Sequence, residues 1–260
     1  MRSSPHPAFL PDNPPCRWPG PPAHTGLSSG EVHAWCVSLD RALPGLHALV
    51  RALSEDELQR AERFRFERDR TRFILCRGTL RRVLGRYLNE TPEEVRFRYG
   101  AHGKPALADV CGGDGLRFNL SHSDGCVLYA VAHGAEVGVD LERIRPVRDA
   151  DGIVRRFFSP REQDAYFALP PDRRPEAFFA GWTRKEACLK ATGEGFFLSL
   201  DRFDVALDPG APARLLRIDG DPERAARWSL QALTPVDGYA AAVAVEGPCE
   251  RLSCWQWPAI

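Results

Sequence analysis

The segment Gly181–Phe196, GWTRKEACLKATGEGF, holds two of the three lysines of this chain, Lys185 and Lys190. The third is Lys104, and every other basic side chain among the 35 Lys and Arg residues is an arginine. Lysine carries a compact ammonium that can donate a proton, whereas arginine carries a broad planar fork that stays charged. We therefore predict that this segment uses lysine where arginine would not serve.

The same segment ends a predicted helix that runs from about residue 174 to 192 and stops at Gly193. Glu186 and Lys190 are four residues apart and share one face of this helix, with Trp182 one turn earlier. A Glu–Lys pair at this spacing is often only a surface ion pair worth about 0.3–0.5 kcal/mol. Because this chain uses arginine for ordinary positive charges, we favour a functional pair.

The motif VGVDLE at 137–142 predicts a strand with Gly138, Asp140 and Glu142 on one face. Two carboxylates about 6.6 Å apart repel each other unless a cation lies between them. Gly138 is expected to leave space for a ligand beside them. With Glu186 as a third oxygen ligand, the set is typical of a magnesium site, and the helix lysine could then reach a phosphate oxygen. A solvent-facing acidic edge is the alternative.

A second group of polar residues suits phosphate. In the motif FNLSHSDG, Ser121 offers a hydroxyl, His122 an imidazole and the following turn backbone N–H groups. Lys104 lies in a turn between glycine and proline, where a rigid backbone could approach a flat ring. A structural histidine and a solvated turn are the alternatives, and adjacent strand residues face opposite sides, which argues against a Ser–His nucleophile pair. Arg60, Arg63 and Arg72 lie on the predicted helical run; most such arginines solvate a surface, and we expect only one or two of them to meet a ligand.

The remaining patterns predict an α+β fold. Two capping boxes, Ser54 with Glu57 and Ser159 with Glu162, mark the starts of helices. Short turns between three consecutive strands predict antiparallel neighbours. The predicted elements are a strand from residue 31, a helical run from 54 to 88 broken near Phe66, a strand and turn around 95–107, three strands between 118 and 144, helices from 159 and 174, and strands at 203–207, 228–233 and 239–245.

The overall composition excludes several classes of protein. The formal net charge of +0 argues against nucleic-acid and membrane partners. No apolar run approaches the length of a membrane span, and the start of the chain has no secretion signal pattern. The eight cysteines form no C-x-x-C pair, which predicts free thiols in a reducing cytoplasm. Residues 1–30 contain eight prolines and predict a disordered extension.

Five motifs occur in a specific order: GKP at 103–105, FNLSHS at 118–123, VGVDLE at 137–142, FFSPRE at 157–162 and WTRKEACLKATGEG at 182–195. Together they resemble the 4'-phosphopantetheinyl transferases of the larger, surfactin-type class, over about residues 31–247. The resemblance implies a monomer in which two similar α/β subdomains, each a small antiparallel sheet packed on helices, form a pseudo-twofold dimer within one chain, with coenzyme A in the cleft between them. The implied divisions are an extension at 1–30, an N-terminal subdomain at 31–134, a C-terminal subdomain at 135–247 and a tail at 248–260.

The resemblance also implies a role for each matched residue. Asp140, Glu142 and Glu186 look like the ligands of Mg²⁺, which Mn²⁺ could replace, and Glu186 is also placed to help deprotonate the acceptor serine. Lys190 resembles the lysine near the coenzyme A pyrophosphate, and Lys185 is expected to help with phosphate charge; Asp140, Glu186 and both lysines count among the coenzyme A contacts. The other implied contacts are Ser121, His122, Arg72 and Arg60 around the 3'-phosphate, and Gly103, Lys104 and Pro105 around adenine.

The implied reaction is Mg-dependent transfer of 4'-phosphopantetheine from coenzyme A to a serine of an apo acyl or peptidyl carrier protein, with release of adenosine 3',5'-bisphosphate. Two alternatives remain: a Mg-dependent nucleotide pyrophosphohydrolase, and a catalytically silent module that binds carrier proteins. The segment 144–174 is the expected acceptor surface, where Phe157 and Phe158 are either an apolar patch or core. One basic position of the family falls at Glu57, so that contact is absent or moved.

Overall fold

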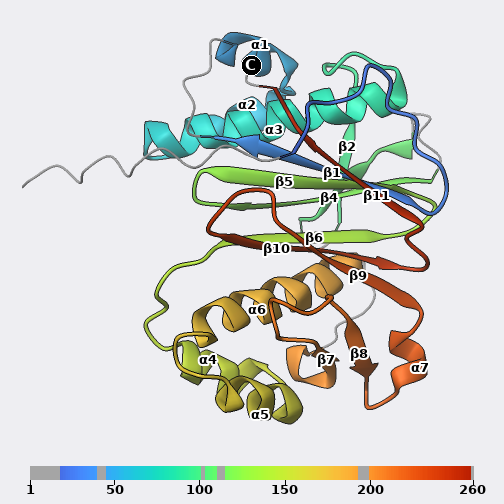
Figure 1. Cartoon of the computed structure of the whole chain (residues 1–260). Coiled ribbons are helices and arrows are strands. Elements are labelled where there is room, and N and C mark those ends of the chain that lie inside the picture. Colours follow the sequence, from blue (N-terminus) through green and yellow to red (C-terminus); the bar gives the residue numbers. More distant parts are fainter. Residues whose placement is uncertain (1–17, 40–44, 101–102, 110–114, 193–198, 259–260) are drawn as a thin grey trace, which may run out of the picture.

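The computed structural model of the chain describes residues 18–39, 45–100, 103–109, 115–192 and 199–258. Two sheets lie face to face in the middle of the molecule, and helices cover the outer side of each (Figure 1). The four layers are therefore helix, sheet, sheet and helix. This arrangement agrees with the predicted mixture of small sheets and helices.

Within the described residues, the N-terminal half begins with a strand, continues with three helices and ends with four strands. The capping box of Ser54 and Glu57 is present at the start of α2, and Phe66 is the N-cap of α3, so the predicted helical run and its break are confirmed. The elements are β1 Glu31–Ser38, α1 Leu46–Ala52, α2 Glu55–Glu62, α3 Glu67–Leu88, β2 Phe97–Tyr99, β3 Pro105–Leu107, β4 Leu116–Ser123 and β5 Cys126–His133.

In the described residues the C-terminal half also begins with a strand and three helices, but a short helix interrupts its later strands. The second capping box, Ser159 with Glu162, is present at the start of α5. The predicted helix stop at Gly193 lies outside the described residues. The elements are β6 Val137–Arg143, α4 Ala150–Phe157, α5 Pro160–Ala168, α6 Arg174–Ala191, η3 Leu200–Arg202, β7 Phe203–Val205, β8 Leu215–Ile218, α7 Pro222–Ala225, β9 Trp228–Leu233, β10 Tyr239–Glu246 and β11 Arg251–Gln256.

Strand pairing is the same in the two halves. With β11 set aside, the first strand of each half pairs antiparallel with the last strand, and that last strand pairs antiparallel with the one before it, which gives the orders β1-β5-β4 and β6-β10-β9. Each half also carries a separate two-stranded sheet, β2 with β3 and β7 with β8. The chain thus contains one topology twice, and the pseudo-twofold axis between the copies stays a prediction.

The end of the chain is not a tail, contrary to the prediction for residues 248–260. Strand β11 extends the N-terminal sheet by pairing in parallel with β1. The pairing brings Trp255 and Trp257 to ring-centroid distances of 4.8 and 5.5 Å from Trp35, so burial of aromatic surface favours it. Two residues of the predicted extension also make contacts: Leu27 packs against the N-terminal core, and the Pro19 carbonyl accepts a hydrogen bond from the Gln256 N–H of β11.

The chain changes sheets between β5 and β6. Strands β4 and β5 are antiparallel neighbours as predicted, but β6 pairs with β10 in the other sheet. The physical reason is that Val137, Val139 and Leu141 belong to the core between the two sheets, where they meet apolar residues of β1 and β5. The short turn is therefore a crossing between layers and not a hairpin.

Both faces of β1 are buried, which explains its apolar content. Ala34 and Cys36 face the core between the sheets, whereas Trp35 and Val37 face the helices α1 and α3. The structure records the cysteines of its described residues as thiols outside any disulfide. No helix within the described ranges is both long and apolar enough to cross a membrane.

Candidate active site

Strand β6 and helix α6 pack directly against each other because residue 138 is a glycine. A Cβ atom at Gly138 would lie 2.8 Å from the Lys190 carbonyl carbon and closer still to the Ala187 oxygen and the Ala191 nitrogen. The prediction that Gly138 leaves space for a ligand is therefore wrong, because helix backbone fills that space. This close approach brings Glu186 and Lys190 to the acids of β6.

Lys190 and Asp140 form a tight ion pair at the centre of the site. The Lys190 Nζ lies 2.6 Å from Asp140 Oδ1 and 3.1 Å from Ser121 Oγ, and the Ser121 hydroxyl donates to the same Oδ1 at 2.8 Å. Asp140 is only 4% exposed, and its Oδ2 is a buried atom without a hydrogen-bond partner in the described part of the chain. An unpaired buried carboxylate oxygen is unfavourable, so a further ligand is expected there.

Glu142 and Glu186 lie near the same charges. Burial raises the pKa of Glu142, a hydrogen bond from Ser123 at 2.8 Å lowers it, and repulsion by Asp140 raises it. Burial also raises the pKa of Glu186; Asp140 and Glu142 raise it further, while Lys190 lowers it. The three carboxylates are therefore near enough for their charges to raise the pKa of Glu142 and Glu186.

The chemistry of these carboxylates fits a hard divalent cation, because Mg²⁺ and Mn²⁺ are bound by oxygen ligands. The unpartnered Oδ2 of Asp140 is the specific observation in favour. The carboxylates are not drawn together around one point, since no group of three or more His, Cys, Asp or Glu side chains in the described ranges is arranged to hold a metal ion. The oxygen atoms of these side chains suit such an ion, and the side chains would have to rotate to bring those oxygen atoms around it.

A pocket of about 480 Å³ lies in the N-terminal half next to this cluster. Five of the residues predicted to contact coenzyme A line it: Arg60, Arg72, Gly103, Pro105 and His122. Burial lowers the pKa of His122, and the charges of Lys190 and Arg72 lower it further, so a bound anion would relieve this repulsion. The Arg60 guanidinium stacks 5.4 Å above the ring of Phe73 and gives the pocket a flat wall.

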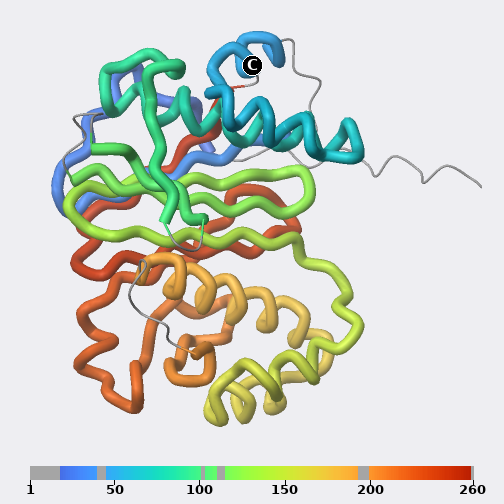
Figure 2. Tube along the Cα trace, turned by 180° about the vertical axis from the view of Figure 1, so that it is seen from behind, coloured from blue at the N-terminus to red at the C-terminus, as the bar shows by residue number. Residues whose placement is uncertain are grey.

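Two of the residues predicted to lie around the 3'-phosphate and adenine, Ser121 and Lys104, do not line this pocket. Ser121 faces the Asp140–Lys190 pair, because adjacent residues of a strand point to opposite sides. The Lys104 Nζ donates to the Lys190 carbonyl oxygen at 2.8 Å and lies 3.6 Å from Glu136. The segment of β2 and β3 thus reaches from the N-terminal half to the end of α6 (Figure 2).

Lys185 lies outside the site, and the prediction that it helps with phosphate charge is wrong. Its side chain is fully buried, and Nζ donates to Glu162 Oε2 at 2.7 Å and to the Leu200 and Phe203 carbonyl oxygens at 2.6 Å each. All three ammonium protons are therefore used inside the C-terminal core.

Two other residues that the sequence singled out, Glu57 and Phe158, are buried in the core. Glu57, at the basic position of the family, is buried and pairs with Arg81 at 2.7 Å and Arg77 at 3.3 Å, and of these two arginines Arg77 lines the pocket. Phe158 is 1% exposed and belongs to the C-terminal core, and Phe157 packs against that core. Phe158 therefore cannot be part of an acceptor surface.

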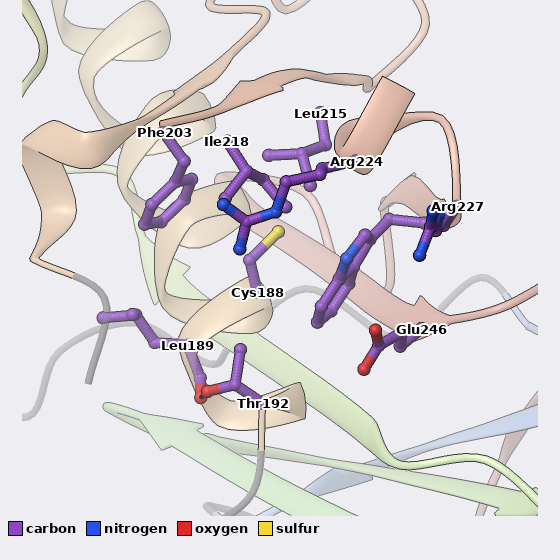
Figure 3. Close-up of a pocket in the computed structure, with 10 residues that line it drawn as sticks. Cys188, Leu189, Thr192, Phe203, Leu215, Ile218, Arg224, Arg227 and Glu246 are labelled. Carbon is purple, nitrogen blue, oxygen red and sulfur yellow. Dashed lines mark hydrogen bonds between the residues drawn. The ribbon is translucent and has the colours of Figure 1, made fainter. Parts of the chain in front are cut away.

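A second pocket, of about 260 Å³, lies beside the end of α6 (Figure 3). Cys188, Leu189 and Thr192 line it from the side of α6, and none of the predicted site residues is among its described lining. Arg224, which also lines this pocket, is paired with Asp219 at 2.6 Å. Burial raises the pKa of the Cys188 thiol to about 12, so this cysteine is not a nucleophile at neutral pH.

Sequence reasoning missed two residues of β4 that contact β6. Asn119 Oδ1 accepts a hydrogen bond from the Val139 N–H at 3.0 Å, and Ser123 bonds the Glu142 carboxylate. The alternation of Asn119, Ser121 and Ser123 was a visible signal of one polar strand face. The partner strand was not visible in the sequence.

Comparison with known proteins gives the family. A profile described as the 4'-phosphopantetheinyl transferase superfamily matches residues 136–244, and one described as 4'-phosphopantetheinyl transferase, N-terminal, matches residues 42–134. The 4'-phosphopantetheinyl transferase HetI of Nostoc sp. is 44% identical over 230 residues, which are 88% of this chain and 94% of that protein. The chain belongs to the 4'-phosphopantetheinyl transferase superfamily.

Other relatives of this transferase agree with the surfactin-type class. The 4'-phosphopantetheinyl transferase psf-1 of Bacillus pumilus is 33% identical over 199 residues, 75% of this chain and 81% of that protein. The 4'-phosphopantetheinyl transferase Sfp of Bacillus subtilis is 30% identical over 155 residues, 60% of this chain and 66% of that protein. A solved structure of holo-[acyl-carrier-protein] synthase from Thermotoga maritima has a TM-score of 0.35 at 20% identity over 44% of this chain and 63% of that one, which is too low to support an inference.

Proposed function

We propose that this transferase moves the 4'-phosphopantetheine group of coenzyme A to a serine of an apo acyl or peptidyl carrier protein and releases adenosine 3',5'-bisphosphate. One observation carries the proposal: a pocket lined by Arg60, Arg72 and His122 adjoins the Asp140–Lys190 pair. A nucleotide with a 3'-phosphate and a pyrophosphate needs such a row of cations, because each phosphate is bound by charge-assisted hydrogen bonds.

Two side chains of α6 share the proton transfers. Glu186 accepts the proton of the attacking serine hydroxyl, and its raised pKa suits a general base that works near neutral pH. As the new bond from serine oxygen to phosphorus forms, the bond from phosphorus to the nucleotide phosphate oxygen breaks. The Lys190 Nζ donates to that leaving oxygen, where negative charge develops.

The carboxylates of Asp140, Glu142 and Glu186 would hold Mg²⁺ or Mn²⁺. When bound, the ion supplies charge neutralisation for the pyrophosphate oxygens. The buried Oδ2 of Asp140 supports this assignment, because it has no other partner among the described residues. The second oxygen of the same carboxylate holds the Lys190 ammonium, which keeps it beside the expected phosphate.

The two halves of one chain supply different parts of this site. The pocket comes from α2, α3, β3 and β4 of the N-terminal half, whereas the carboxylates and the lysine come from β6 and α6 of the C-terminal half. No second copy is needed to complete the site, so we propose that the monomer is active. The segment 144–174, which follows Glu142 in the chain, stays our prediction for the acceptor surface.

Intact mass spectrometry of apo carrier proteins incubated with coenzyme A and Mg²⁺ tests the proposal. The carrier should gain one phosphopantetheine with the wild type, and the gain should disappear with a chelator. Glu186→Gln should lose activity by about 10²–10⁴-fold. Glu176→Gln, a change of an exposed glutamate in the first turn of the same helix, is the matched control and should stay active.

The same assay separates the alternatives. Free phosphopantetheine with an unmodified carrier would favour a pyrophosphohydrolase. A carrier that binds without any change in mass, equally with wild type and Glu186→Gln, would favour a silent binding module. Either result would refute the transfer reaction.

A further inference from the structure

The edges of the two sheets meet beside the active site, where β4 of one sheet runs along β6 of the other. Side chains, and not backbone pairs, join them. Asn119 Oδ1 accepts from the Val139 N–H at 3.0 Å, and Ser121 Oγ donates to Asp140 Oδ1 at 2.8 Å. Alternate side chains along β4 therefore form hydrogen bonds to β6, and Ser123 is the next residue in this series.

Ser123 is fixed between two groups of β6. Its hydroxyl accepts a hydrogen bond from the Arg143 N–H at 3.2 Å and donates one to Glu142 Oε2 at 2.8 Å. Ser123 is 8% exposed, so water competes little for either bond. The backbone bond orients the hydroxyl, and the hydroxyl in turn orients the carboxylate.

We propose that Ser123 is a positioning residue that holds the Glu142 carboxylate in the orientation needed to bind the divalent cation. The inference rests on the proposed metal site of the transferase. With Oε2 held by the hydroxyl, Oε1 is kept at a defined place, as a metal ligand requires. Because Ser123 belongs to the N-terminal half and Glu142 to the C-terminal half, the contact also fixes the relative position of the two halves at the proposed metal site.

Binding of Mn²⁺ followed by electron paramagnetic resonance, without coenzyme A or carrier, tests the proposal apart from catalysis. Ser123→Ala should weaken Mn²⁺ binding by about 10–100-fold, the usual effect of losing a hydrogen bond to a metal ligand. Ser123→Thr keeps the hydroxyl and should restore binding to within about threefold of wild type.

Ser229→Ala is the matched control. The Ser229 hydroxyl also accepts from a backbone N–H, that of Cys249 at 2.9 Å, and donates to the Gly247 carbonyl oxygen at 2.7 Å. This variant loses the same kinds of bond at the far edge of the second sheet. It should reproduce any change in melting temperature of Ser123→Ala and leave Mn²⁺ binding unchanged.

The outcomes separate this inference from the proposed function. Wild-type Mn²⁺ binding by a folded Ser123→Ala variant would overturn the inference and leave the metal site intact. Equal weakening by Ser123→Ala and Ser229→Ala would also overturn it, since the effect would then be one of general stability. A wild type that binds no Mn²⁺ would refute the metal assignment itself, and the inference with it.

Discussion

Replacing Gly138 by alanine should separate the two elements that carry the active site. The added Cβ would meet backbone atoms of Ala187, Lys190 and Ala191, all at less than van der Waals distance, and none of these atoms can rotate away. Helix α6 would have to move by about 1 Å to regain normal contact distances. A displacement of about 1 Å between catalytic groups can lower a rate about 10²-fold. We expect kcat to fall by about that factor.

The cost in stability should be moderate. Overpacking of a close contact destabilises by about 1–3 kcal/mol, which is about 2–10 °C in Tm for a chain of this size. Gly181→Ala is the control on the same helix, because its Cβ would meet the side-chain atoms Leu207 Cδ2 at 2.5 Å and Phe158 Cε2 at 2.8 Å. It should lower Tm similarly and keep kcat within about threefold of wild type.

Carrier modification under saturating substrates measures kcat, and thermal melts measure Tm. A Gly138→Ala protein that melts within the expected range and still turns over like wild type would refute the reasoning. It would mean that the catalytic groups do not depend on the contact between β6 and α6. Equal losses of kcat in both glycine variants would refute it as well.

Two further predictions concern charge and position. In a chelator at pH 7, Glu186→Gln should melt at a higher temperature than wild type, because the raised pKa of Glu186 means that its ionised form destabilises the fold. The difference in Tm should shrink as pH falls through the folded pKa of Glu186 towards 4.5. Thermal melts at several pH values test this, and a constant difference would show that the sign is wrong. Lys104→Gln should lower kcat about tenfold with little change in the KM for coenzyme A, because the Lys104 amine holds the Lys190 carbonyl. Steady-state kinetics that show a raised KM and an unchanged kcat would instead mean that Lys104 binds coenzyme A.

The local features of the fold could be predicted because they depend on neighbours in the chain. Both capping boxes and the break near Phe66 follow from residues within one helical turn of each other. The pairing of β11 with β1 could not be predicted in this way, since it joins Arg251 to Glu31 across almost the whole chain. The same holds for β6, whose neighbour is set by which layer buries Val139.

The active site was predictable to the extent that residue type limits chemistry. Carboxylates that alternate on one strand face, and a glutamate and lysine four apart, point to a metal and a phosphate wherever their partner elements lie. The roles of Gly138 and Ser123 depend instead on what packs against them. Gly138 allows the close approach of helix α6 and leaves no space for a ligand. Ser123, on a strand of the other sheet, holds the Glu142 carboxylate through a hydrogen bond.

Both halves contain a capping box whose buried glutamate forms an ion pair with a long helix, and this arrangement accounts for the burial of Lys185. In the N-terminal half, Ser54 and Glu57 form a capping box, and the buried Glu57 pairs with Arg81 of the following long helix. In the C-terminal half, Ser159 and Glu162 form the equivalent box, and the buried glutamate pairs with a base of the long helix α6. Each box therefore connects a short helix to a long one through an ion pair in the core.

The base differs between the halves because the acceptors are arranged differently. The Lys185 Nζ serves Glu162 and two carbonyl oxygens from one atom, whereas Arg81 bonds its glutamate through Nε and its two carbonyl oxygens through Nη1. A guanidinium at 185 would not fit three acceptors gathered around one point. Lys185→Arg should thus lower stability by about 1–3 kcal/mol in thermal or denaturant melts, without changing the KM for coenzyme A. A raised KM at an unchanged Tm would return this lysine to the active site, and with it the view that both lysines of the segment serve the chemistry.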